Sequence, residues 1–358
     1  MKFSSLILAA SLVFSQFASA DTNIYVSESK DNRVAIFSLD EKTGDLTRRG
    51  DITLAGAPGS LALSKDQSKI YAAVRSASEF ATLSIDPKTG FLKLAGTAPA
   101  AGSAAYVYPD KTGNWLLAAY YGEGQVSVSK IENGIVKGEP VQIFATGKKA
   151  HCIQVDPSNQ FAFTPHTGDL NKVQQFQFNA DNGTLSLNDP PQLDGAEGAG
   201  PRHMQFHPNG EWAYLVNEQS KSVTHCDFDP AKGTLIKRKT LSSHPADWDL
   251  TKGSCADIEI SADGKFLYCS NRGHNSIGMF SINQDTGELT SLGQESTEDT
   301  PRSFNLIPGG EKFLVAAGQR SNTLAVYRRD AKTGRLEKLK TYDCGGSPAW
   351  VMGVHFAD

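Results

Sequence analysis

The sequence lacks the features that mark several common kinds of protein. Beyond its first 20 residues it holds no apolar run of the roughly 20 residues that a membrane span requires. Its five cysteines are an odd number and follow neither a CxxC nor a zinc-ligand spacing, so we expect no metal and no cofactor. One disulfide could form in an oxidising compartment, but at least one thiol must stay unpaired. We expect the thiols to act mainly as small buried apolar groups.

The charge distribution and the absence of two catalytic motifs make several classes of function less probable. The formal net charge is −4 and the charged residues are scattered, which gives no electrostatic footprint for nucleic acid or an anionic membrane. The chain contains neither a G-x-S-x-G nor an H-E-x-x-H motif. Serine-hydrolase and zincin chemistry are therefore disfavoured.

The N-terminus has the pattern of a secretory signal. Lys2 precedes the apolar run "LILAASLVF", and "ASA" ends at Ala20. A membrane anchor is the alternative, but the run is too short for a span. We expect residues 1–20 to be cleaved, leaving a periplasmic or secreted protein without a membrane partner. Residues 21–358 would then form a single domain.

Two short patterns recur along the rest of the chain. Apolar runs such as "NIYVSES", "KIYAAVR" and "FLYCSNR" appear seven times, with their third residues spaced by 46, 46, 46, 51, 54 and 47 positions. Glycine turns such as "KTGDL" and "KTGRL" recur in phase, also seven times. A unit of about 45 residues that reads as four alternating segments is typical of a β-propeller blade. The apolar residues alternate with a period of two, which excludes a helical solenoid.

The sequence therefore predicts an all-β, seven-bladed propeller with four antiparallel strands in each blade. The chain opens on the run at 23–28 without an inner strand, whereas "GSPAWVMGVHF" near the C-terminus is an inner strand without a partner. We expect these two segments to pair and to close the ring, because closure removes the free sheet edges.

The repeat also indicates which residues share one rim of the ring. Asn-Gly in "HPNG" predicts a tight hairpin turn that folds Arg202 back beside Glu218. The residue twelve positions before each run's third residue should start an inner strand, and the residue four positions after it should end the next strand. This offset brings His151, Arg202, Glu218 and Arg272 to one mouth. The other blades carry small uncharged residues at the equivalent starts of their inner strands: Gly59, Ala105, Ala256 and Ser303.

Further residues are expected at the same mouth. The equivalent strand-end positions of other blades hold Arg75, Tyr121, Thr167 and Gln319. His203 and Asp257, one residue further along their strands, are second-rank substrate-binding candidates. The long segments 187–200 and 241–254 should overhang this rim as walls or a partial lid, because long loops on one face of a repeat array usually mark the binding face.

The four ionisable residues fit hydrolysis of an ester-like carbonyl. One arginine would stabilise the oxyanion, Glu218 or His151 would activate water, and the other arginine would hold an anionic part of the substrate. The simpler alternative is that Arg202 and Glu218 form an ion pair that ties two strands. A metal held by His203 and His207 is disfavoured, because the two residues flank the start and the turn of one strand.

Several stretches, including "GPRHM", "VNE", "SNR" and "GSPAWVMGVHF", resemble the seven-bladed lactonase family. That family contains bacterial propeller-type 6-phosphogluconolactonase and the fungal cis,cis-muconate lactonizing enzyme. The resemblance implies a small-molecule lactone substrate, metal-free ring opening, and His151, Arg202, Glu218 and Arg272 as the catalytic set. The export signal departs from the cytoplasmic phosphogluconolactonases, so an unphosphorylated lactone is a second expected substrate. A non-catalytic propeller that binds a peptide or glycan is the alternative function.

Overall fold

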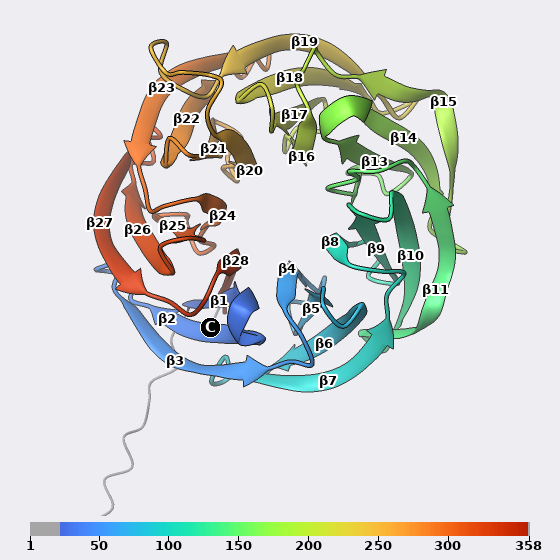
Figure 1. Ribbon diagram of the computed structural model, residues 1–358, viewed down its shortest axis with the longest axis horizontal. Coiled ribbons are helices and arrows are strands. Elements are labelled where there is room, and N and C mark those ends of the chain that lie inside the picture. The colour runs from blue at the N-terminus through green and yellow to red at the C-terminus, as the bar shows by residue number, and fades with distance from the viewer. Residues whose placement is uncertain (1–21, 357–358) are drawn as a thin grey trace, which may run out of the picture.

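Seven four-stranded antiparallel sheets make up the ring that the computed structural model describes over residues 22–356. Figure 1 shows the sheets as blades around a central channel, with one strand of each blade lining it. The predicted all-β, seven-bladed propeller is confirmed.

Each blade has one strand at the channel and three further strands arranged outwards from it. In this order, blade 1 holds β28 (Pro348–His355), β1 (Thr22–Glu28), β2 (Arg33–Leu39) and β3 (Leu46–Thr53). Blade 2 holds β4 (Pro58–Leu63), β5 (Lys69–Val74), β6 (Glu79–Ile85) and β7 (Leu92–Pro99). Blade 3 holds β8 (Ala104–Pro109), β9 (Trp115–Tyr120), β10 (Gln125–Glu132) and β11 (Ile135–Ala145). Blade 4 holds β12 (Gln154–Val155), β13 (Phe161–His166), β14 (Lys172–Asn179) and β15 (Thr184–Asp194).

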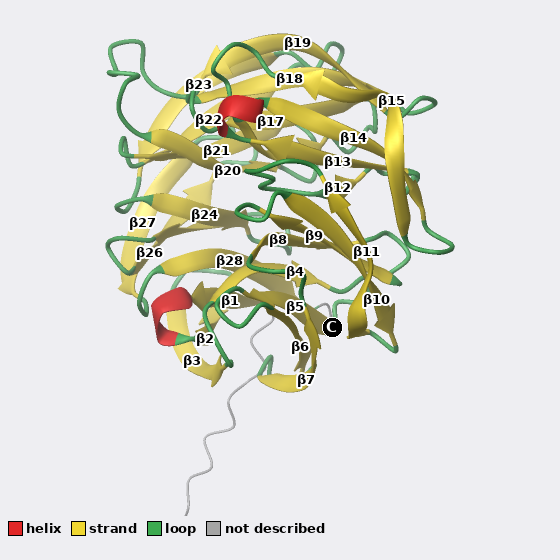
Figure 2. Ribbon diagram, turned by 45° about the vertical axis from the view of Figure 1, so that its right-hand side comes forward, coloured by secondary structure: helices red, strands yellow, loops and turns green. Residues whose placement is uncertain are grey.

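The remaining blades follow the same order. Blade 5 holds β16 (Pro201–Phe206), β17 (Trp212–Asn217), β18 (Ser222–Asp229) and β19 (Thr234–Ser242). Blade 6 holds β20 (Ser254–Ile260), β21 (Phe266–Arg272), β22 (Ser276–Ile282) and β23 (Leu289–Ser296). Blade 7 holds β24 (Pro301–Leu306), β25 (Phe313–Gly318), β26 (Thr323–Arg329) and β27 (Leu336–Asp343). The described helical turns are short 3-10 segments, η1 (Ser29–Asp31) and η2 (Gly168–Leu170), which Figure 2 shows in red.

The two sequence markers of the repeat meet each other between neighbouring blades. The Tyr25 hydroxyl of blade 1 donates to the Gly90 carbonyl of blade 2 at 2.8 Å. Tyr268 of blade 6 donates in the same way to Gly334 of blade 7, also at 2.8 Å. Both glycines have a positive φ, near 70°, which favours glycine. Each tyrosine is fully buried, so these hydrogen bonds join the blades across their apolar interfaces. Equivalent bonds run from Tyr71 to Gly134 and from Tyr214 to Gly287.

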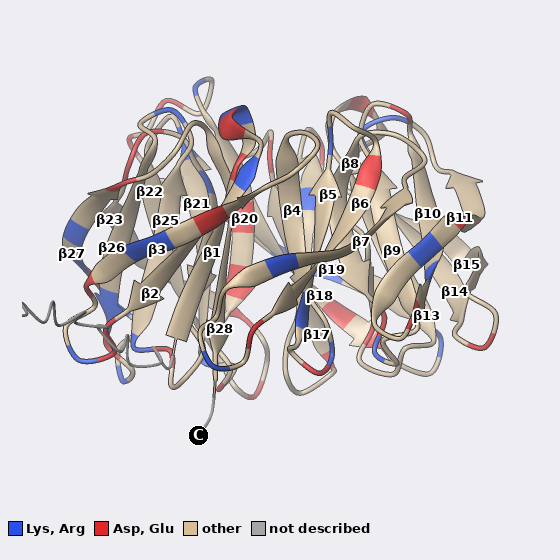
Figure 3. Cartoon of the chain, turned by 90° about the horizontal axis from the view of Figure 1, so that it is seen from below, with Lys and Arg blue, Asp and Glu red and all other residues tan. Residues whose placement is uncertain are grey.

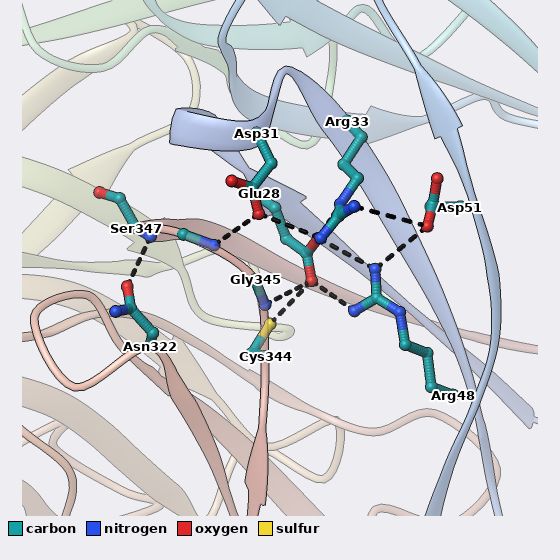
Figure 4. A network of polar contacts seen from close by, with 10 residues as sticks. Glu28, Asp31, Arg33, Arg48, Asp51, Asn322, Cys344, Gly345 and Ser347 are labelled. Atoms are coloured by element: carbon teal, nitrogen blue, oxygen red, sulfur yellow. Dashed lines mark hydrogen bonds and ion pairs between the residues drawn. The ribbon is translucent and has the colours of Figure 1, made fainter.

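The ring closes as predicted, with both ends of the described chain in blade 1. Strand β28 pairs antiparallel with β1, from Thr22 opposite His355 to Glu28 opposite Pro348. The Glu28 carboxylate, whose side chain is 0% exposed, lies at the end of this pair. It accepts hydrogen bonds from Arg33 (2.5 Å), Arg48 (2.6 Å) and the Gly345 amide (2.7 Å), as Figure 4 shows. This network, called the closure latch below, ties the segment before β28 to the N-terminal hairpin.

The described residues also test the expectations for the cysteines, the distribution of charge and membrane-spanning segments. All five cysteines are free; Cys152, Cys226, Cys255 and Cys269 are buried and Cys344 is half-buried. Lysine, arginine, aspartate and glutamate are interspersed along the side of the ring in Figure 3. No helix within residues 22–356 is long and apolar enough to cross a membrane. The proposed signal, residues 1–20, lies outside the part that the structure describes.

Candidate active site

The hairpin of β16 and β17 places Arg202 beside Glu218, as the sequence predicts. Pro201 pairs with Asn217, and a β-bulge at Arg202 shifts the register before His203 pairs with Val216. Such a bulge re-aims the side chain at that position. The turn differs from the expected primed turn: five residues connect the strands, and Gly210 has a positive φ whereas Asn209 does not.

Glu218 lies between two arginines from neighbouring blades. Its Oε2 is 3.4 Å from Arg202 Nε, and its Oε1 is 3.0 Å from Arg272 Nη2. The Arg202 side chain is only 1% exposed, against 16% for Arg272 and 20% for Glu218. Burial, together with the guanidinium groups of Arg302 and Arg272, lowers the pKa of Arg202 to about 9. The cluster is therefore largely shielded from water. It is not a surface ion pair of the kind that adds little to stability.

A second set of contacts fixes the Arg202 guanidinium. Its Nη1 donates to the Ala256 carbonyl and lies 3.2 Å from His203 Nε2. His203 Nδ1 in turn lies 2.8 Å from Asp257 Oδ1. This bond requires a proton on Nδ1, so Nε2 accepts from Arg202. The second-rank candidates His203 and Asp257 thus orient Arg202 through its Nη1, whereas Glu218 faces its Nε.

His151 comes from the third neighbouring blade. It precedes β12, which has only two residues, and so it does not begin a regular inner strand as predicted. Its amide donates to the Pro165 carbonyl at 3.1 Å, and its ring meets those of Tyr121 and His203 edge to face, at 5.6 and 5.0 Å. The ring is 6% exposed and its Nδ1 has no hydrogen-bond partner within the described chain. Burial, followed by the nearby Arg202 charge, lowers the pKa of His151 well below 6.5, so the ring is neutral at neutral pH.

A cavity of about 350 Å³ opens where these residues meet. Ionisable and amide side chains supply part of its wall: Arg75, His151, Arg202, His203, Arg302 and Gln319. Glu218 lies beside the wall and contacts it through Arg202, and Arg272 in turn pairs with Glu218. The structure thus brings the four predicted catalytic residues together, with His151 and Arg202 nearest to the space for a substrate.

Arg302 is the ionisable wall residue that sequence reasoning missed. The repeat offset places Ser303 at the position equivalent to Arg202. In the structure, however, the bulge of blade 7 falls between Pro301, opposite Gly318, and Ser303, opposite Ala317. The hairpin of this blade is one residue longer than that of blade 5, which moves the equivalent position to Arg302. Aligning the bulges rather than the strand centres would have found it.

The long segments do not form the predicted walls or lid. Residues 184–194 continue as the outer strand β15, which uses up half of the first segment. Neither segment contributes a residue to the wall of the cavity. In the second segment, Trp248 instead stacks on His244 and meets His274 edge to face. The ends of both segments instead lie next to site residues: the Glu218 amide donates to the Gly200 carbonyl at 2.7 Å, and Ser254 pairs with Arg272.

A second cavity of about 500 Å³ occupies the other half of the channel. His203 and Trp350 border both cavities. Its wall is largely apolar and includes Glu259, which accepts hydrogen bonds from Asn305 and the Leu306 amide. Burial, and next the charge of Asp257, raises the pKa of Glu259 to about 8.

Metal-binding groups do not gather at either cavity. Within residues 22–356, no three His, Cys, Asp or Glu side chains are arranged to hold an ion. His203 and His207 have separate partners, since His207 Nε2 bonds to the Gly264 carbonyl at 2.8 Å.

The fold and the charged cluster agree with a known family. The chain belongs to the family "Lactonase, 7-bladed beta-propeller", whose model matches residues 17–353. Its enzymatic class is accordingly that of a lactone hydrolase, which favours an enzyme over a non-catalytic propeller.

Individual proteins that resemble this chain in sequence or structure are also lactonases or share the propeller fold. The chain is 34% identical over 328 residues to the 6-phosphogluconolactonase of Pectobacterium carotovorum, covering 92% of this chain and 97% of that protein. The 6-phosphogluconolactonase of Yersinia pestis is also 34% identical, with coverages of 92% and 96%. A Lactobacillus plantarum protein of 28% identity superposes with a TM-score of 0.82, covering 93% of this chain and 99% of that one. The periplasmic gluconolactonase of Pseudomonas aeruginosa shares the fold, with a TM-score of 0.85, 24% identity and coverages of 94% and 99%.

Proposed function

We propose that the chain hydrolyses a sugar 1,5-lactone in the cavity of about 350 Å³, opening it to the aldonic acid. The substrate named for its 34%-identical relatives, 6-phosphogluconolactone, is the leading candidate. The observation that carries the proposal is the pairing of a buried neutral imidazole, His151, with a fixed, buried guanidinium, Arg202, at one cavity wall.

His151 is the general base in this proposal. Its ring borders the cavity. Nδ1 is buried, whereas no described residue hydrogen-bonds to Nε2, which is the nitrogen left to take a proton from water. Both Glu218 oxygens already face an arginine. Of the two bases that the sequence left open, the structure therefore favours His151. Glu218 is a positioning residue that holds Arg202 and Arg272.

Arg202 stabilises the oxyanion. Its side chain is held from two sides by Glu218 and by the Ala256 carbonyl. A fixed donor in a site with little water needs no reorganisation as charge develops on the carbonyl oxygen, which is the condition for effective electrostatic stabilisation.

The reaction then balances without a covalent intermediate on the enzyme. Water attacks the lactone carbonyl carbon while its proton moves to His151, and the carbonyl oxygen becomes an oxyanion beside Arg202. The tetrahedral centre collapses, the bond from carbon to ring oxygen breaks, and His151 returns the proton to that oxygen.

The test replaces His151 by Gln and measures lactone loss, corrected for spontaneous hydrolysis. We expect kcat to fall by about 10²-fold or more, the usual scale for a general base. Glu218→Gln is the comparison, because it removes the charge that holds Arg202 but keeps His151. Turnover by folded His151→Gln at the parent rate would exclude His151 as the base.

We also propose that residues 1–20 direct export of the chain. The support is the apolar run followed by "ASA". N-terminal sequencing of the protein recovered from the periplasm or medium should begin at Asp21. Recovery of the uncleaved chain in the cytoplasm would contradict this.

A further inference from the structure

Arg302 is a buried cation that the proposed hydrolysis does not use. It follows Pro301 on β24 and sits in the bulge of blade 7, so it occupies the place that Arg202 occupies in blade 5. Its guanidinium borders the cavity. Within the described chain no side chain or carbonyl accepts a hydrogen bond from it, and no carboxylate lies within ion-pair distance. Burial, followed by the Arg272 and Arg75 charges, lowers the pKa of Arg302 to about 10.

Arg75 also lines the cavity, and a glycine at position 59 leaves room for its side chain. It follows β5, and its Nε donates weakly to Ser103 Oγ at 3.3 Å. Its aliphatic stem crosses Gly59, where an added Cβ would lie only 2.7 Å from Arg75 Cδ. Gly59 occupies the bulge of blade 2. The small residue at this position therefore leaves room for the arginine, which explains why one wall of the cavity can hold two cations.

The charges around the cavity do not balance. Four guanidinium groups gather at the cavity: Arg75, Arg202 and Arg302 in its wall, and Arg272 beside it. The carboxylates among them are Glu218 and Asp257. His151 and His203 are neutral at pH 7, since burial holds the pKa of each below its ordinary value, to about 4 for His203. Glu123 also acts on Arg75, and its Oε1 accepts a hydrogen bond from the amide of the wall residue Ser103 at 2.8 Å. Four cations against three anions leave one positive charge without a counterion.

The wall also offers hydroxyl donors next to these cations. Ser76 Oγ accepts from the Ala57 amide at 2.8 Å, and Ser103 Oγ accepts from Arg75. Each hydroxyl therefore keeps its own proton to donate. Both serines border the cavity. Guanidinium groups with adjacent hydroxyls form a donor set that suits a tetrahedral oxyanion.

From these contacts we infer that Arg302 and Arg75 form a subsite for a dianionic substituent of the substrate, such as a phosphate monoester, and that Arg302 sets the preference for phosphorylated over unphosphorylated lactones. This inference rests on the proposed function for the reacting part of the site. It assigns the part of the wall that blades 2 and 7 supply to the anionic end of the substrate. A phosphate monoester carries nearly two negative charges at pH 7 and would neutralise the excess.

The kinetic test compares two lactones that differ in one group. Arg302→Gln and the parent are assayed with 6-phosphoglucono-1,5-lactone and with glucono-1,5-lactone. We expect kcat/KM to fall about 10-fold or more for the phosphorylated lactone, the scale for one hydrogen bond to a charged group, and to change by less than about 3-fold for the other. Arg320→Gln is the matched control, because Arg320 is exposed and follows the wall residue Gln319; it should leave both values near those of the parent.

A binding test does not depend on turnover. Inorganic phosphate should raise the Tm of the parent and of Arg320→Gln above that in chloride of equal ionic strength, but not the Tm of Arg302→Gln. Equal losses on both lactones, or a phosphate shift that survives in Arg302→Gln, would overturn the inference. If no lactone is turned over but the phosphate shift depends on Arg302, the proposed function fails and the anion subsite stands.

Discussion

The closure latch allows a quantitative prediction for Glu28→Gln. Burial alone would raise the pKa of Glu28, but hydrogen bonds from Arg48 and Arg33 overcome this and lower it from 4.5 to about 2. At 1.36 kcal/mol for each pH unit, this gap corresponds to about 3 kcal/mol of stability at neutral pH. Glutamine cannot provide it, so the free energy of unfolding should fall by about that amount.

The pH dependence of this loss follows from the direction of the pKa change. Because the folded-state pKa is depressed, the stabilisation is complete above pH 4.5 and disappears as the pH falls through 2. At pH 3 the difference between the parent and Glu28→Gln should be less than about half of its value at pH 7.

Urea unfolding followed by tryptophan fluorescence at both pH values measures this difference. Asp51→Asn is the matched control, because Asp51 contacts the same two arginines from a side chain that is 33% exposed. It should cost at most about 1 kcal/mol. A loss in Glu28→Gln that is equal at pH 7 and pH 3, or no larger than that of Asp51→Asn, would refute the reasoning.

Three further predictions concern the ring and the site. Removing residues 346–358 takes away β28 with its buried Val351 and Val354. The free energy of unfolding should then fall by about 4 kcal/mol or more. An unchanged Tm would contradict closure of the ring through β28. Tyr268→Phe deletes the hydroxyl that bonds to Gly334 and should cost about 1–2 kcal/mol in chemical unfolding, with no change in lactone turnover. Glu218→Gln should lower kcat while preserving the far-UV circular dichroism spectrum; activity equal to the parent's would remove Glu218 from the site.

The blade architecture could be predicted because its two markers are local and repeated. The apolar run and the glycine turn each recur seven times, and their spacing fixes the unit. What the sequence did not reveal is that the two markers bond to each other across blades, as Tyr25 does to Gly90. That contact depends on how one blade stacks on the next, which is not encoded within a single repeat.

The site was predicted in part, and each error has a geometric cause. A constant offset places Arg202 and Glu218 correctly because their hairpin matches the repeat. It misses Arg302 because the hairpin of blade 7 is one residue longer. It also gives His151 a strand start that blade 4 lacks, since β12 has only two residues. Burial and the resulting pKa changes depend on three blades meeting at one mouth, and no single repeat contains that information.

The central claim is that the chemistry takes place in the cavity between His151 and Arg302. A crystal structure with the hydrolysis product 6-phosphogluconate tests this most directly. We predict the carboxylate within hydrogen-bond distance of Arg202 and His151, and the phosphate on Arg302 and Arg75. A product molecule bound instead in the cavity beside Glu259, at the other half of the channel, would contradict the account.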